Sequence, residues 1–266
     1  GDPAASREIR GNGPFSDFAA DVALATDGVD RLAGQITVKA AENDATGFAA
    51  TLAGDLAPLF LPEYAAFFGN RVALNVTGQR EADGRLDLSK LDLSAKALTL
   101  QGALSLAPDG LPRSFALTGR IAAADGAPVL LPLTTELPVL VTSADIDLGF
   151  DAAQGEGWRA AASIQGLDRA DFRDARLTLS GSGRVAGGKA TRIGATLRFE
   201  AEGRWPTDAA LAAALGSFVS GDAVAYWTQG DGAVSIPRLN LLGEDYSARL
   251  GGRITGPDEA LTISGR

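Results

Sequence analysis

The chain has 266 residues, a hydrophobic fraction of 45% and a formal net charge of −9. This apolar content is enough for one large domain or two ordinary ones, and it excludes a disordered protein. The negative charge argues against a nucleic-acid-binding protein, which needs a basic face, and against electrostatic attachment to anionic lipid headgroups.

Three residue types that usually carry chemistry or mark a natural start are absent, namely Cys, His and Met. The lack of Cys and His removes disulfides, thiolate nucleophiles and the commonest general base and metal ligand. Because the chain opens without Met and stops inside an alternating pattern, we expect a fragment of a longer protein. A signal peptide or membrane anchor would then lie outside it.

The first segment, residues 1–54, alternates apolar and polar residues in stretches such as "DVALAT" and "GQITVKA". A period of two predicts strands with one apolar and one polar face. Residues 55–69, "DLAPLFLPEYAAFFG", carry apolar residues at helical spacing, which predicts a short amphipathic helix. Its aromatic residues favour a plug in a hydrophobic core over a ligand pocket.

Strands resume over residues 70–204, where "RLDLSKLDLSAKALTLQGALSL" and "RIGATLRFEAEG" alternate most clearly. In the second stretch Ile193, Leu197 and Phe199 face one way, whereas Thr196 and Arg198 face the other. Asp- and Gly-rich stretches such as "EADGR" and "APDGLP" separate the strands as turns. A second short helix is predicted over 206–221 and further strands over 222–266.

An internal repeat of about 150 residues connects the two halves. Leu86, Leu88, Leu91 and Leu93 align with Val234, Ile236, Leu239 and Leu241, each 148 positions later. Each repeat contains many strands and one short helix. The pattern therefore predicts an all-β fold class with antiparallel strands and two short amphipathic helices.

No motif predicts catalysis. The glycines of "GSGRVAGG" lie between strands, so they indicate a hairpin turn and no dinucleotide loop. Asp145, Asp147 and Asp151 lack the glycine and ligand spacing of a calcium loop, and alternation places the first two on a solvated face. We therefore expect no enzyme, no cofactor and no metal site.

The repeated one-sided apolar pattern has two interpretations. A β-sandwich or solenoid would bury this face against itself, since any antiparallel sheet with one packed face alternates in this way. An open, curved sheet would instead leave the face free to hold lipid chains, because each methylene group removed from water contributes about 0.8 kcal/mol.

The stretches "LAPLFLPEYAAFFG", "VALNVTG", "ADGRLDLSKLDLSAKALTLQGALSL" and "IPRLNLLGEDYSARLGGRI" resemble the mid-section of the TamB family. This family belongs with the AsmA-like and bridge-like lipid-transfer proteins of Gram-negative bacteria and their relatives. The resemblance rests on a repeated pattern and covers most of the chain.

The resemblance implies an elongated, curved antiparallel β-sheet, a β-taco or repeating groove with an apolar interior. It also implies a periplasmic segment of a protein anchored in the inner membrane, whose groove conducts phospholipid between the inner and outer membranes. The outer-membrane barrel TamA would be a partner through regions outside this fragment, and no nucleic acid would be bound. The residues expected to line the groove and contact acyl chains are Leu86, Leu88, Leu98, Leu100, Ile193, Leu197, Phe199, Val234, Ile236 and Leu250.

Three other functions compete with this one. The chain could be a scaffold or chaperone for outer-membrane protein assembly, pairing a sheet edge with client strands. It could be a structural solenoid or adhesin with a closed core. A carbohydrate-active β-helix enzyme would need converging carboxylates and aromatic side chains, and the sequence shows no such cluster.

Overall fold

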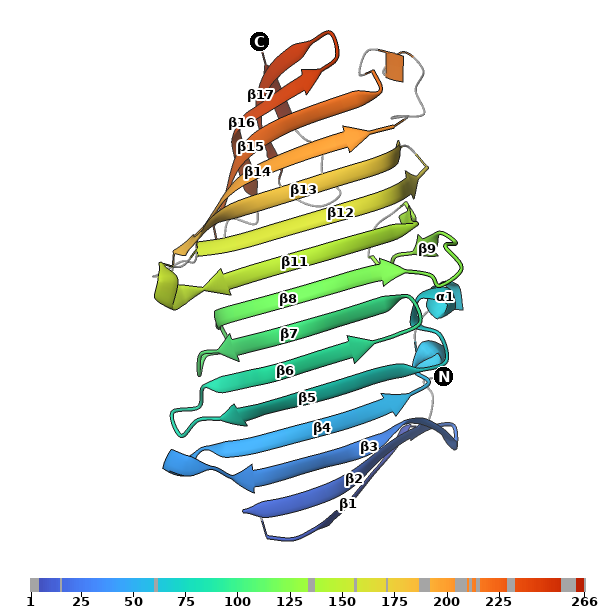
Figure 1. Ribbon diagram of the computed structural model, residues 1–266, viewed down its shortest axis with the longest axis vertical. Coiled ribbons are helices and arrows are strands. Elements are labelled where there is room, and N and C mark those ends of the chain that lie inside the picture. Colours follow the sequence, from blue (N-terminus) through green and yellow to red (C-terminus); the bar gives the residue numbers. More distant parts are fainter. Residues whose placement is uncertain are drawn as a thin grey trace. The chain divides into compact units, whose positions relative to one another are not determined.

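The computed structural model describes residues 5–14, 16–59, 62–133, 137–155, 157–170, 172–186, 192–203, 210, 212–213, 216–228, 233–254 and 262–265. The chain divides into two units, residues 1–132 (unit 1) and 133–266 (unit 2). Both are built almost wholly from antiparallel strands (Figure 1), so the predicted all-β class with a curved antiparallel sheet is confirmed.

Unit 1 is an antiparallel sheet in which each strand from β1 to β8 pairs with the next along the chain. Hairpin connections of this kind follow from the short turns between the alternating segments. The strands are β1 (Ala5–Asn12), β2 (Asp17–Thr26), β3 (Val29–Ala40), β4 (Thr46–Gly54), β5 (Val72–Arg80), β6 (Leu86–Ser94), β7 (Leu98–Leu106), β8 (Pro112–Ala122) and the short β9 (Val129–Leu130).

Unit 2 has the same meander, with each strand from β11 to β18 pairing with the next. The short β10 pairs with β12 through Leu140 and Asp168. The strands are β10 (Leu140–Val141), β11 (Ser143–Asp151), β12 (Gly157–Arg169), β13 (Phe172–Ala186), β14 (Arg192–Glu202), β15 (Phe218–Thr228), β16 (Val234–Gly243), β17 (Ser247–Ile254) and β18 (Thr262–Gly265).

The predicted Asp-Gly turns share one geometry. In each, the Asp side chain accepts a hydrogen bond from the backbone N–H two residues later, and the Gly takes a positive φ that other residues avoid. The pairs are Asp83–Gly84, Asp109–Gly110 and Asp125–Gly126, with N···O distances of 2.9, 3.1 and 3.1 Å and Gly φ angles of 90°, 84° and 73°.

The segment predicted as a helix over 55–69 contains a series of short helical turns. These are η2 (Ala57–Leu59), η3 (Pro62–Tyr64) and the single α-turn α1 (Ala65–Phe68). Two other 3₁₀ turns, η1 (Glu42–Asp44) and η4 (Ala152–Gln154), connect strands. Pro58 and Pro62 supply no N–H, which favours short turns over one continuous helix.

The helix predicted over 206–221 falls largely outside the described residues. Ala210, Ala212 and Ala213 are helical, but the chain is already extended at Phe218, where β15 begins. The predicted end at 221 is therefore wrong by four residues. The alternation of apolar and polar residues in "SFVSGDAVAYW" indicates a strand, and the prediction of a helix over this stretch did not take it into account.

Matching bulges support the internal repeat. The pairing of β6 with β7 shifts register between Leu88 and Leu91, and the pairing of β16 with β17 shifts between Ile236 and Leu239. Each shift inserts one extra residue into the strand, so that Leu88 and Leu91 face the same way, as do Ile236 and Leu239. The two bulges lie 148 residues apart, at the offset found in the sequence.

Gly34 marks a close approach of two backbones in unit 1. A Cβ atom there would lie 1.9 Å from the carbonyl oxygen of Thr51 on β4, whereas one at Gly47 would have its nearest neighbour at 3.6 Å. We therefore expect Gly34→Ala to destabilise unit 1 by about 1–3 kcal/mol through overpacking. Gly47→Ala, on the paired strand, should raise stability by up to about 1 kcal/mol.

Urea denaturation of the two variants, followed by circular dichroism, checks this prediction. Equal stabilities for the two variants would contradict the close approach at Gly34.

Candidate functional site

Cross-strand rows of unit 1 separate apolar from polar residues across all eight long strands. One row of directly paired residues runs Ile9, Val22, Gly34, Leu52, Leu74, Leu93, Leu100, Gly119. The neighbouring row runs Arg10, Asp21, Gln35, Thr51, Asn75, Asp92, Gln101, Thr118. Because successive side chains point to opposite sides, the sheet of unit 1 has one apolar face and one polar face.

Unit 2 repeats this separation from β11 to β17. Its apolar row runs Leu148, Ala160, Gly181, Leu197, Ala223, Leu239, Leu250. The adjacent polar row runs Asp147, Ala161, Ser180, Arg198, Asp222, Asn240, Arg249. Each unit therefore carries an apolar face that extends across every long strand and is not interrupted by a charge within these rows.

All ten residues predicted to line a groove lie on these apolar faces. The four from unit 1 belong to β6 and β7 and pair with apolar residues on the next strand. The six from unit 2 belong to β14, β16 and β17. Leu197 is 40% exposed, and the other nine are partly buried.

The apolar faces lack a covering layer of large side chains. Among the described residues, the buried apolar set consists mostly of alanines, and Val129 and Val141 are the only fully buried large side chains. The strands contact mainly their neighbours in the sheet, so the interpretation with a closed core lacks a second layer in the described part.

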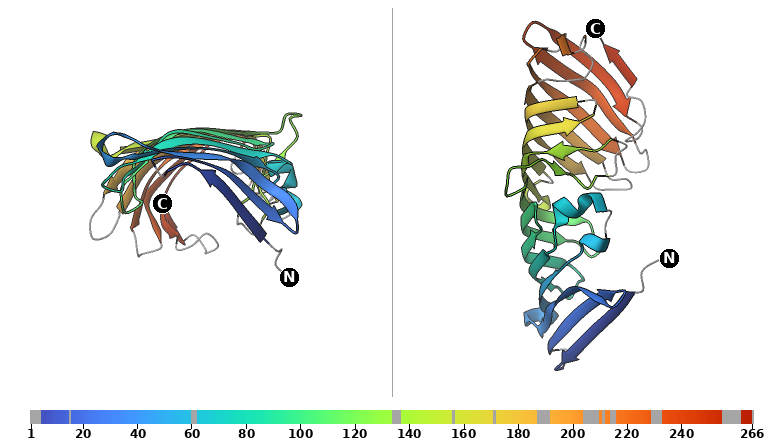
Figure 2. Two further views of the ribbon diagram at one scale, coloured as in Figure 1. Left: turned by 90° about the horizontal axis from the view of Figure 1, so that it is seen from below. Right: turned by 90° about the vertical axis from the view of Figure 1, so that its right-hand side faces the viewer.

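A small cluster at the edge of unit 1 shows which way the sheet curves. Phe67 is 4% exposed and packs with Ala97 and Val129 beside Leu98 and Ile121, which belong to the apolar face. Lys96 and Ala97 donate backbone hydrogen bonds to the carbonyls of Phe68 and Phe67, at 3.1 and 3.0 Å. Figure 2 shows α1 on the side toward which this sheet bends, so the apolar face of unit 1 is the concave one.

Aromatic rings lie across glycines of neighbouring strands on the apolar faces. A Cβ atom at Gly221 would meet the ring of Phe199 at 2.7 Å, and one at Gly181 would meet the indole of Trp158 at 3.2 Å. Trp158 Nε1 also donates a hydrogen bond of 3.1 Å to the carbonyl oxygen of Gly194. Because these glycines have no side chain, the aromatic rings can lie flat against the backbone of the sheet. The rings therefore project little from the apolar face.

The apolar face of unit 2 contains a hollow of about 370 Å³. Its walls are almost wholly apolar. The lining residues are Ile146, Leu148, Ala160, Ala161, Ala162, Leu179, Ser180, Gly181, Leu197, Arg198, Phe199 and Ala223. Leu197 and Phe199 were predicted from the sequence. The small residues that make the hollow were not, because their position opposite larger side chains depends on strand register.

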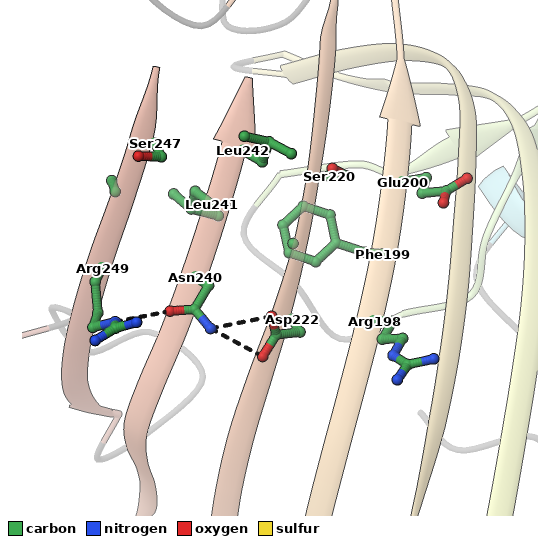
Figure 3. Close-up of a pocket in the computed structure, with 12 residues that line it drawn as sticks. Arg198, Phe199, Glu200, Ser220, Asp222, Asn240, Leu241, Leu242, Ser247 and Arg249 are labelled. Carbon is green, nitrogen blue, oxygen red and sulfur yellow. Dashed lines mark hydrogen bonds between the residues drawn. The ribbon is translucent and has the colours of Figure 1, made fainter. Parts of the chain in front are cut away.

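A second hollow, of about 810 Å³, lies against β14–β17 and is drawn in Figure 3. Its lining mixes apolar with charged side chains, several of which hydrogen-bond to one another across strands. Asn240 Nδ2 donates to both carboxylate oxygens of Asp222, at 3.1 and 3.2 Å, and Arg249 Nε donates to Asn240 Oδ1 at 3.2 Å. Figure 3 shows this chain of bonds across β15, β16 and β17. It stabilises the polar face by cross-strand pairing.

Other types of site find little support in the described part of the chain. No group of three or more acidic side chains gathers there to hold a metal ion. Asp145 and Asp147 lie on the exposed polar face, and Arg159 Nε lies 3.9 Å from Asp147 Oδ1. None of the helices in the described residues has the length and apolar character needed to cross a membrane.

Comparisons with protein-family models, with curated proteins and with solved structures find no match to this chain. The two apolar faces are therefore the feature of the molecule that indicates a function.

An aspartate on the apolar face tests how open that face is. Leu197→Asp on β14 should lower stability by about 1 kcal/mol, because the side chain is 40% exposed and the charge stays hydrated. Val219→Asp on β15, where the side chain is 5% exposed, should cost about 3–5 kcal/mol because its charge is buried without a partner.

Urea titrations of both variants, with Thr196→Asp on the polar face as the control, measure the difference. Comparable losses at Leu197 and Val219 would indicate a covered face.

Proposed function

We propose that the apolar faces bind the acyl chains of phospholipids. The chain is then a periplasmic segment of a TamB-like protein that conducts phospholipid between the inner and outer membranes. In this proposal the parent protein is anchored in the inner membrane, and any contact with the barrel TamA uses regions outside this fragment. No cofactor and no reacting residue are required.

The observation that carries the proposal is the row of paired apolar residues that crosses every long strand of each unit. In unit 1 the row has eight members and in unit 2 it has seven, with no polar side chain among them. A lipid chain moving along such a row stays in contact with hydrocarbon and need not pass a hydrated charge, whose removal from water is costly.

Energetics favour occupation of these faces near a membrane. Each methylene group transferred from water onto the sheet contributes about 0.8 kcal/mol. Apolar side chains such as Leu179 and Leu197, 38% and 40% exposed, would be shielded by the same lipid. Because this stabilisation has no directional bonds, a chain held by it can slide.

Two of the three competing functions, the scaffold and the structural solenoid, make different use of the sheet. A scaffold that pairs strands with client proteins would use a sheet edge and backbone hydrogen bonds, and the apolar face would have no role. A structural solenoid would bury the face against a second layer. The largely alanine-based set of buried residues supports an open face over a closed one.

Site-specific photo-crosslinking in cells tests the proposal. A photoreactive residue replaces Leu197 or Leu100 on the apolar faces, and Thr196 or Gln101 serves as the adjacent polar-face control. We expect phospholipid to be captured at Leu197 and Leu100, and little or none at the controls, because only the first two face the apolar row.

Protein adducts alone at Leu197 and Leu100 would reject the lipid conduit and favour the scaffold. A lack of adducts at both positions, in a folded protein, would favour a closed structural role.

A further inference from the structure

Unit 1 is asymmetric along the direction of its strands. At one end of β5–β8 lies the small cluster around Phe67, and we name this end the covered margin. At the other end the strands are joined by short turns, and we name it the open margin. Figure 1 shows α1 and β9 at the covered margin, beside the ends of β7 and β8. An inference from this asymmetry rests on the proposed function, since it concerns how a phospholipid lies on the apolar face.

Apolar groups of the protein itself close the covered margin. Phe67 is 4% exposed and packs against Leu98 at the start of β7 and Ile121 at the end of β8, which pair with each other on the apolar face. Ala97 and Val129 complete the cluster and are buried. The ring of Phe67 therefore takes the place on this part of the face that an acyl chain would otherwise occupy.

Backbone hydrogen bonds attach α1 to the sheet. The amides of Lys96 and Ala97, in the connection from β6 to β7, donate to the carbonyls of Phe68 and Phe67. Gly69 follows α1 so close to this connection that a Cβ atom there would lie 2.5 Å from Lys96 Cβ. The segment is thus bonded to the end of the sheet as a further layer at the covered margin.

A matching helical turn occurs in unit 2, at the corresponding place in the internal repeat. In unit 1 the N–H of Gly69 donates to the carbonyl of Ala65 at 2.9 Å, and in unit 2 the N–H of Gly216 donates to the carbonyl of Ala212 at 3.1 Å. Both glycines have a positive φ, 65° and 73°, which glycine adopts without strain. Each repeat therefore ends a helical turn with a glycine just before its next strand.

The turn of unit 2 is also attached to the matching connection between strands. Ser217 Oγ donates a hydrogen bond of 2.5 Å to Glu244 Oε1, in the connection from β16 to β17. Glu244 lies 148 positions after Lys96, which is the offset of the repeat. The two units hold this segment at the same place with different bonds, a pattern that favours a role for the position itself.

The open margin of unit 1 is built differently. Its connections 41–45, 81–85 and 107–111 are each closed by a hydrogen bond from the first N–H to the last carbonyl, at 2.9, 2.8 and 2.8 Å. The tips of these turns, among them Asp83 and Asp109, are exposed. A polar group that lies beside them keeps its contact with water, whereas one placed at the covered margin would meet buried apolar side chains.

We propose that the cluster around Phe67 sets the orientation of a phospholipid on the apolar face of unit 1. The acyl chains extend along the strands toward Phe67, and the headgroup lies at the open margin beside 81–85 and 107–111. The reverse orientation would bury a charged headgroup without a partner, which is costly. Lipid therefore enters and leaves this face by the open margin.

Two photoreactive lipids test the orientation on the purified chain. Both are phosphatidylethanolamines, one with a diazirine on the headgroup and one with a diazirine at the terminal carbon of an acyl chain. Each is supplied in phosphatidylcholine vesicles, and adducts are mapped by peptide mass spectrometry. We expect the ratio of headgroup to tail adducts to be at least about tenfold higher at 81–85 and 107–111 than at 95–98, because burying an unpaired polar group costs at least that factor.

Removal of the ring should abolish this preference. Phe67→Ala opens the covered margin, so the ratios at the two margins should become nearly equal. Phe67→Leu keeps an apolar side chain in the cluster and should retain the preference. The matched control is Phe115→Ala, which removes the same ring from the apolar face of β8 near the open margin and should leave the preference unchanged.

The outcomes separate the orientation from the proposed function. Equal ratios at both margins of the wild-type chain, or a higher ratio at the covered margin, would overturn the orientation and leave the lipid conduit standing. A lack of adducts from both probes on the apolar faces would overturn both proposals. An unchanged preference in Phe67→Ala, with a cooperative thermal transition retained, would overturn the role of Phe67. The wild-type comparison decides the orientation even when that variant does not fold.

Discussion

The whole structure depends on one constraint, which is that the alternation along each strand stays in phase with the register between strands. A slip of one residue would turn a strand's apolar set to the polar side and bring Asp and Arg side chains to the apolar face. The eight-residue apolar row of unit 1 and the seven-residue row of unit 2 show that the phase is kept at every pairing. The bulges in β6 and β16 help to keep this phase. Without the extra residue, the side chains of Leu91 and Leu239 would lie on the polar face.

Each of the two sheets has an apolar face that no second layer covers in the described part of the chain. Water solvates such a surface poorly. Soluble proteins usually bury such faces, and large exposed apolar patches mark interaction sites. The polar face is meanwhile stabilised by cross-strand pairs such as Asn240 with Asp222, so each sheet can remain soluble on one side. This division of roles between the two faces explains why the proposed function needs no reactive residue.

The strands, the Asp-Gly turns and the faces of the leucines could be predicted from the sequence, because each depends on residues close together in the chain. The alternation in "RIGATLRFEAEG" is enough to place Leu197 and Phe199 on the same side. The hollow could not be predicted in this way. It exists because Ala160 pairs with Gly181 and Gly181 with Leu197, and those pairings join residues 21 and 16 positions apart. The start of β15 at Phe218 was missed because an Ala-rich run outweighed the alternation that followed it.

The pairing of each long strand with its predecessor and successor has a consequence for how stability is distributed. A meander of this kind approaches a one-dimensional array, in which the total stability is a sum of hairpin and neighbour terms. Opening then begins at β1 in unit 1 and at β18 in unit 2, and amide hydrogen exchange would slow from these strands toward the middle of each unit. The same independence lets an additional hairpin be inserted during evolution without repacking a shared core, so the number of strands in such a sheet, and with it the extent of its apolar face, is free to change.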